Sequence, residues 1–231
     1  TQHLDRIGRL KTGRLRISRH VIEHVRQHRQ AGPRSRYLFS GEERGPTILF
    51  MLLTRSERLS LLHLSSALGV SQNTVISDLK KVRAAARAHR LSVSYDRVNG
   101  YHIAGEELDK RHLLLRCLRR VLEMPVAGAA VVRNNRAIGD YLEPVSSLFS
   151  EIEKRLKIQF TDIQLQELIY FSCFILQRIA GGKYLQALPG YYADIAAGRD
   201  YAVIHSIASK TDIDRPQEII FLTALIRSAN I

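Results

Sequence analysis

The sequence of 231 residues is poor in cysteine and has no long apolar run. Its two cysteines, Cys117 and Cys173, are too few for the disulfide-rich scaffold of a small secreted protein. No apolar run approaches the roughly 18 residues that a membrane-spanning helix needs, and no signal-peptide pattern opens the sequence. We therefore expect a soluble, cytoplasmic protein without a membrane partner.

The short motifs of common catalytic and metal sites are also absent. We find no Cys-x-x-Cys, no His-Glu-x-x-His, no Gly-x-Ser-x-Gly and no glycine-rich phosphate loop after a strand-like segment. His20, His24 and His28 share one face of a short helix expected over residues 18–29, but a solvated basic face explains them better than a metal site. Both cysteines lie in amphipathic segments and are expected to be small core residues. We predict no catalytic residue, no metal site and no cofactor.

Acidic residues are scarce in the first half only, so the formal net charge of +13 is unevenly distributed. Residues 1–45 contain 11 Lys or Arg against 4 Asp or Glu, and residues 46–125 contain 13 against 7. Residues 126–231 contain 11 of each and are neutral. A basic half can neutralise phosphates and release their counterions, whereas a neutral half has no electrostatic reason to contact them. This asymmetry predicts that the first half binds nucleic acid.

The hydrophobic pattern after residue 45 predicts three short helices. Pro46 suits the first turn of the first helix, and Ser60 and Ser71 suit the N-caps of the second and third. A tight turn at Gly69 separates the second helix from the third. The predicted helices cover residues 46–53, 61–68 and 72–89. In the third, the residues expected to face the core are Val75, Leu79 and Val82.

After the third helix the periodicity changes from helical to alternating. Residues 91–95 and 101–103 alternate apolar and polar side chains, and Asn99-Gly100 between them is a strong hairpin signal. An amphipathic helix is then expected over residues 107–123. Three helices followed by a hairpin make a winged helix-turn-helix. The leucines expected on the apolar stripe of the last helix are Leu108, Leu115, Leu118 and Leu122.

In a winged helix-turn-helix, the start of the third helix enters the major groove of DNA. Gln72 and Asn73 are suitable base readers because a carboxamide can pair twice with adenine. Arg97 and Asn99 would lie at the tip of the hairpin, where they could meet the DNA backbone or minor groove. The other predicted DNA-binding residues of the third helix are Ser71, Thr74, Ser77, Lys80 and Lys81.

Two short patterns in this region point to a family. The first is Val70-Ser71, two variable residues, Thr74-Val75 and then Asp78-Leu79, and the second is the hairpin segment 100–105, Gly-Tyr-His-Ile-Ala-Gly. Together they resemble the Mga-type winged helix of BglG- and Mga-like bacterial regulators of sugar operons, which carry PTS-regulation domains (PRDs). The resemblance covers about residues 37–123. It implies a transcription regulator that binds double-stranded DNA, with activation of carbohydrate-uptake genes as the expected role.

Residues 124–231 resemble a first PRD. Apolar stripes predict helices over residues 138–156, 162–180 and 201–209, and from 216 to the last residue. Arg178 and Gly181 match the family's Arg-x-x-Gly, and Glu218 matches the glutamate that begins its last helix. The fold class expected for the whole chain is therefore mainly α, a winged helix-turn-helix followed by an all-helical bundle. The resemblance implies that this bundle forms a homodimer.

The histidines that the phosphotransferase system phosphorylates in PRDs are missing. They lie seven residues before the arginine and seven after the glutamate, where this sequence has Phe171 and Leu225. Neither side chain has a nucleophilic nitrogen, so both are expected in a packed interface, and the domain is expected to serve dimerisation or relay. His205, the one histidine after His112, is expected to be a surface or packing residue. Phosphotransferase-system proteins would then act through domains outside this sequence.

The predicted domains are a basic segment, linker or remnant of another helix-turn-helix (1–45), a winged helix-turn-helix (46–123) and a PRD-like domain (124–231). Two other functions remain open. Some PRD proteins are RNA-binding antiterminators, but their RNA-binding domain is all-β, whereas the segment here is helical with one hairpin. The other alternative is an interaction scaffold that does not bind DNA, and the salt dependence of binding would distinguish it.

Overall fold

The computed structural model describes residues 8–9, 15–16, 37, 39–124, 127–208 and 213–229. The chain divides into two compact units, Thr1–Arg36 and Tyr37–Ile231. In the first unit, strands β1 (Gly8–Arg9) and β2 (Leu15–Arg16) pair in antiparallel fashion. The helix expected over residues 18–29, with His20, His24 and His28, lies outside the described residues.

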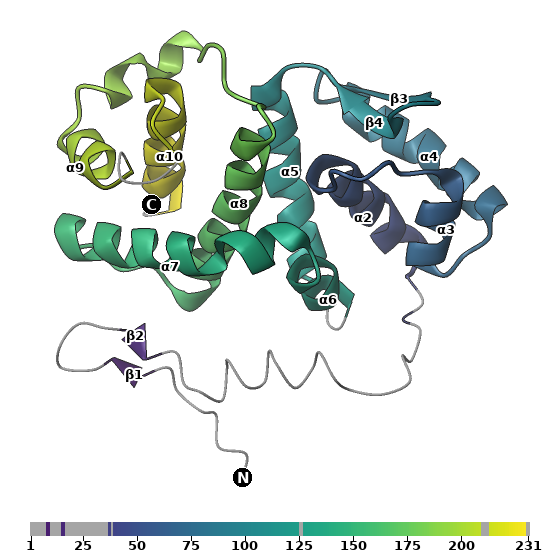
Figure 1. Ribbon diagram of the computed structural model, residues 1–231, viewed down its shortest axis with the longest axis horizontal. Helices are drawn as coiled ribbons and strands as arrows, with labels where there is room; N and C mark the ends of the chain where they lie inside the picture. The colour runs from purple at the N-terminus through teal and green to yellow at the C-terminus, as the bar shows by residue number, and fades with distance from the viewer. Residues whose placement is uncertain are drawn as a thin grey trace. The chain divides into compact units, whose positions relative to one another are not determined.

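The second unit is mainly helical, which confirms the predicted mainly α class (Figure 1). None of the helices described here has the length and apolar character needed to cross a membrane. In chain order the elements are α2 (Gly41–Thr54), α3 (Leu61–Leu68), α4 (Gln72–Arg87), β3 (Ser92–Asp96), β4 (Gly100–Ala104), α5 (Glu107–Leu122), α6 (Ala127–Arg133), α7 (Arg136–Leu156), α8 (Asp162–Ala180), the 3₁₀ helix η1 (Gly190–Ile195), α9 (Arg199–Ala208) and α10 (Pro216–Ala229).

Helix α2 begins five residues before the predicted start at Pro46. Ser40 Oγ accepts a hydrogen bond from the Glu43 amide, and the Glu43 carboxylate accepts one from the Ser40 amide, so the pair forms a capping box. Pro46 therefore lies inside the helix, and its placement in the first turn was wrong. The first turn is polar and carries no apolar periodicity, which is why the hydrophobic pattern starts too late.

The segment from α3 to α4 follows the sequence prediction closely. Ser60 caps α3, and Gly69 ends it with φ of 70°, a left-handed conformation that favours glycine. Ser71 then caps α4 through a hydrogen bond that its Oγ accepts from the Thr74 amide. The tight turn between the caps brings α3 and α4 into contact. The apolar residues predicted to face the core, Val75, Leu79 and Val82, are buried.

The predicted hairpin is also present. Strands β3 and β4 pair from Ser92 opposite Ala104 to Asp96 opposite Gly100. The Tyr101 amide donates a 2.8 Å hydrogen bond to the Leu59 carbonyl, so the chain just before α3 joins the edge of the hairpin. Gly100 has φ of +70°, and a Cβ there would collide with the Leu59 carbonyl. Glycine is thus required at this position for both its conformation and its small size.

Helix α5 lies between α2 and α8 (Figure 1), and it contacts both. Its apolar side is only partly the predicted one, because Leu118 is buried but Leu108, Leu115 and Leu122 are half-buried. The residues that α5 does bury include Leu113, Leu114, Cys117 and Val121. A buried side this wide is expected for a helix packed from two directions.

The remaining helices pack around α8. Helix α7 contacts α8 and α9, and α10 contacts α8, α9 and η1. The predicted bounds of α8 agree with the structure, and those of α7, α9 and α10 agree within about two residues at the ends described. The short elements α6 and η1 were not predicted. Both are too short to show a clear apolar period.

Candidate nucleic-acid interface

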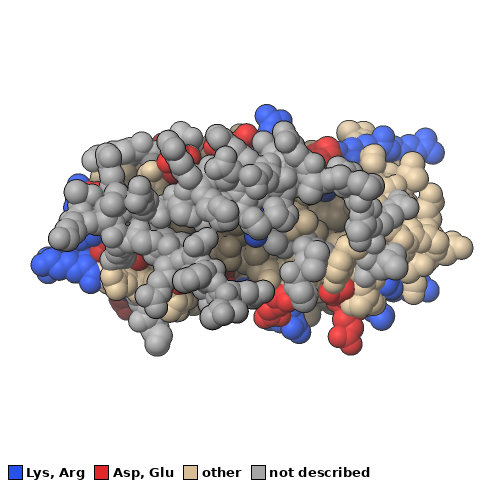
Figure 2. Space-filling model, turned by 90° about the horizontal axis from the view of Figure 1, so that it is seen from below, with Lys and Arg blue, Asp and Glu red and all other residues tan. Residues whose placement is uncertain are grey.

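The outer face of α4 presents most of the residues predicted to bind DNA. Gln72 and Asn73 are exposed in its first turn, and Ser77, Lys80 and Lys81 are exposed further along. Figure 2 shows Lys and Arg side chains at both ends of the molecule, including the end where Figure 1 places α3 and α4. We call this the α4 surface, formed by Gln72, Asn73, Ile76, Ser77, Lys80 and Lys81.

Ser71 and Thr74 have local partners. Besides the cap to the Thr74 amide, the two hydroxyl oxygens lie 2.9 Å apart, within hydrogen-bond distance. These contacts hold the start of α4 in a fixed geometry. The other backbone N–H groups of a first helical turn have no partner within the helix and carry partial positive charge, which suits phosphate or carbonyl acceptors. Ser71 and Thr74 thus shape the end of the helix that Gln72 and Asn73 occupy.

The one carboxylate in α4, Asp78, is turned away from this surface. Asp78 is 5% exposed, and one of its oxygens lies 2.6 Å from Arg44 Nε of α2. This ion pair ties α4 to α2 and neutralises the buried charge. The exposed side chains of α4 are consequently neutral or cationic. Sequence reasoning placed Asp78 in the family pattern but did not assign this role, because the partner lies in a different helix.

The tip of the hairpin is shaped by Asp96. Its carboxylate accepts hydrogen bonds from the amides of Val98 (2.9 Å) and Asn99 (2.6 Å) and from the Asn99 side chain (3.1 Å). The Asn99 and Val98 bonds and the nearby His102 hold the pKa of Asp96 below its usual value despite the small opposing effect of desolvation. Asn99 therefore stabilises the turn, whereas Arg97 and Val98 are exposed at the tip.

No protein-family model matches this chain, and no curated protein matches it significantly.

Phe171 and Leu225 lie inside the helical half. Phe171 is fully buried and Leu225 is 8% exposed, and both line one small cavity of about 10 Å³ between α8 and α10. That volume accommodates about one water molecule and no metabolite. The two positions therefore belong to the core of this chain. His205 is exposed on α9, with its ring 5.8 Å from the Tyr201 ring, as expected for a surface histidine.

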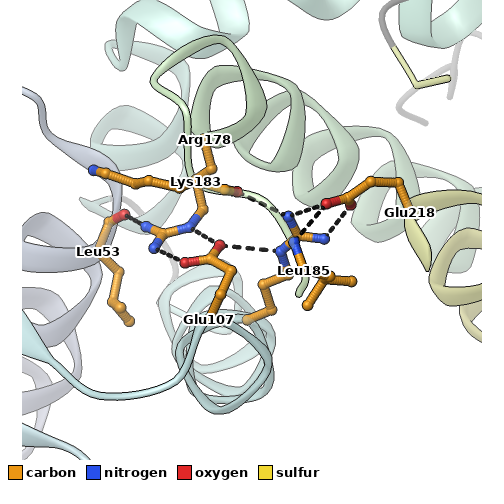
Figure 3. A network of polar contacts seen from close by, with 7 residues as sticks. Leu53, Glu107, Arg178, Lys183, Leu185 and Glu218 are labelled. Carbon is orange, nitrogen blue, oxygen red and sulfur yellow. Dashed lines mark hydrogen bonds and ion pairs between the residues drawn. The ribbon is translucent and has the colours of Figure 1, made fainter. Parts of the chain in front are cut away.

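A buried ion network joins α5 to the helical half, and Figure 3 shows it. Arg178 of α8 donates two 2.7 Å hydrogen bonds to the Glu107 carboxylate of α5 and a third, of 2.6 Å, to the Leu53 carbonyl in the last turn of α2. Arg111, one turn after Glu107, donates a 3.1 Å hydrogen bond to that carboxylate and pairs with both oxygens of Glu218 in α10.

The network also satisfies backbone groups of the loop after α8. Arg111 donates to the Lys183 carbonyl at 3.2 Å, and the Leu185 amide donates to Glu218 at 2.9 Å. Burial raises the pKa of Glu107, but the hydrogen bond and charge of Arg178 and the charge of Arg111 outweigh it, so its pKa lies below the usual value. Two cations meet two anions, and the charges balance.

Only part of this network could be predicted from sequence patterns. Arg178 and Glu218 match the PRD patterns, but their partners lie 71 and 107 residues earlier in the chain. The two cysteines are buried, as predicted, and burial raises the pKa of each thiol to about 12. Neither is therefore a reactive thiolate at neutral pH.

Proposed function

We propose that this chain is a DNA-binding transcription regulator. In this proposal α2, α3, α4 and the β3–β4 hairpin form a winged helix-turn-helix, and α6 to α10 form a PRD-like bundle. The observation that carries the proposal is the α4 surface. It combines exposed carboxamides in the first turn, exposed lysines behind them and no exposed carboxylate on the helix.

Each group on this surface suits a different part of a DNA duplex. The carboxamides of Gln72 and Asn73 can donate to and accept from an adenine edge in the major groove. Lys80 and Lys81 lie two turns further along α4 and suit the phosphates that flank the groove. Arg97, at the hairpin tip, suits the backbone or the minor groove.

Selection of bound duplexes from a pool of random DNA tests this proposal. We expect a defined motif to be enriched, and its affinity to fall with salt by a log–log slope of about −0.9 per phosphate contact. Gln72→Ala should change the selected motif, whereas Gln166→Ala, at an exposed position on α8, should leave it unchanged. Enrichment of RNA alone would indicate an antiterminator. Binding to neither would indicate an interaction scaffold, and either result would overturn the proposal.

The role of the helical half is proposed from the resemblance to PRD regulators. We propose that it serves dimerisation or relay in the control of carbohydrate-uptake genes, without phosphorylation at Phe171 or Leu225. Incubation with the phosphotransferase phosphocarriers, followed by intact-mass measurement, should show no added phosphoryl group. Stoichiometric phosphorylation within residues 126–231 would contradict this role. Sedimentation of the whole chain should give twice the monomer mass, and a monomer at all concentrations would exclude the dimer.

A further inference from the structure

An apolar side chain lies within the polar α4 surface. Ile76 is 45% exposed, whereas the other large apolar residues of α4 are buried in the core. It follows the exposed Gln72 and Asn73 by four and three residues and precedes Lys80 by four, so all of them share one helical face. Single exposed apolar residues are common on protein surfaces. The position of this one, between the proposed base readers and the proposed phosphate contacts, gives it a specific candidate ligand.

We propose that Ile76 contacts the 5-methyl group of a thymine in the major groove. This inference rests on the proposed DNA-binding function and adds a base preference to it. Thymine is the only standard base that presents a methyl group in that groove, and apolar side chains recognise it by contact. Because Gln72 and Asn73 suit adenine, the three residues together favour a half-site that contains A·T pairs.

The electrostatics of α4 allow this contact. Asp78, the only carboxylate of the helix, is buried against Arg44, so no anion on α4 repels the DNA backbone around Ile76. The lysines at positions 80 and 81 can hold the phosphates while Ile76 meets the base edge. Ile76 carries no hydrogen-bonding side chain. Ile76 contributes to binding by burying apolar surface against the thymine methyl group. Burial of a methyl-sized group contributes about 0.8 kcal/mol to the binding free energy, or about 4-fold in affinity.

Replacing thymine by deoxyuracil tests the contact directly, because deoxyuracil lacks only the methyl group. Each thymine of the selected duplex is replaced in turn, and the dissociation constants of the wild-type chain and of Ile76→Ala are measured. At one position in each half-site, deoxyuracil should weaken wild-type binding about 4-fold. Ile76→Ala should lose that sensitivity at the same position. Ile163→Ala, which changes the 80% exposed isoleucine of α8, should respond to deoxyuracil as the wild type does.

The outcomes separate this inference from the proposed function. The inference is overturned if Ile76→Ala remains as sensitive to deoxyuracil as the wild type, if no thymine position affects wild-type binding, or if the selected motif contains no thymine. In each of these cases a change of motif caused by Gln72→Ala would leave the DNA-binding function standing. If no duplex is enriched at all, both the function and the inference are overturned.

Discussion

The α4 surface and the buried ion network use basic residues in opposite ways. On the α4 surface, Lys80 and Lys81 are exposed and form no salt bridge with any residue that the structure describes. In the network, Arg111 and Arg178 are buried and are matched by Glu107 and Glu218. Arg111 is nevertheless counted in the basic half of the sequence. Glu107 is counted in the same half, so the pair leaves the net charge unchanged. The number of basic residues in a segment, however, overstates the cations available to a nucleic acid, and only partners and burial separate the two kinds of cation.

Glu218→Gln, which disrupts the buried ion network, should have the largest effect on stability. It removes the charge of Glu218 and leaves the fully buried Arg111 guanidinium with only Glu107, a carboxylate that it shares with Arg178. We expect a loss of about 3–5 kcal/mol in the free energy of unfolding, measured by urea denaturation. Glu143→Gln changes an exposed glutamate of α7 and should have little effect. A loss below about 1 kcal/mol for Glu218→Gln would mean that this pair is not essential to the fold.

Gly100→Ala should disturb the hairpin beside the α4 surface. The alanine would have to adopt φ of +70° and would collide with the Leu59 carbonyl, so we expect a loss of about 1–3 kcal/mol in unfolding free energy. Gly139→Ala is the matched control, because its Cβ would meet no atom within 4 Å and its helix favours alanine. Equal stability of the two variants would contradict the close approach of Leu59.

Gln72→Ala and Asn73→Ala test whether the α4 surface reads DNA bases. Each should lower discrimination between the selected duplex and a mismatched one by about 1–3 kcal/mol, with little change in unfolding free energy. Competition binding against duplexes with single base changes measures this discrimination. Unchanged discrimination in both variants would show that these carboxamides do not read bases.

Lys81→Ala should weaken binding to all duplexes nearly equally and reduce the slope of the salt dependence by about one phosphate contact. Lys154→Ala, at an exposed position on α7, serves as the control and should leave affinity and slope unchanged. Titrations over a range of salt concentrations give both quantities. An effect confined to one sequence would instead make Lys81 a base reader.

Acidification should lower the stability of the folded chain through titratable groups on and beside α5. Burial lowers the pKa of His89 and His112 in the folded chain, and contacts with Arg178 and Arg111 keep that of Glu107 low despite its burial. All three groups bind protons more readily when unfolded, so stability should fall as pH drops below about 6.5, and fall further below about 4.3. Urea midpoints measured from pH 8 down to about pH 3 test this. A stability that rises on acidification would contradict it.

Local signals predicted α3, α4, the hairpin and α8 well, because caps, glycines and apolar periods lie within each segment. Ser71 and Gly69 mark their turn without any help from the rest of the chain. The start of α2 was missed because its first turn is polar. The pairing of Asp78 with Arg44, and of Glu218 with Arg111, could not be predicted, since it depends on helices that meet only in the folded structure.

The hydrogen bond from Arg178 to the Leu53 carbonyl makes the two halves interdependent. The last carbonyl groups of a helix have no partner within it, and here a guanidinium from α8 supplies one for α2. A truncated chain that stops at Met124 would therefore lose a C-terminal cap of α2 and both arginine bonds to Glu107 from α8. The helical half thus completes α2, a helix of the half that we propose binds DNA, so a shift of α8 relative to α5 would alter the hydrogen bonding at the end of α2.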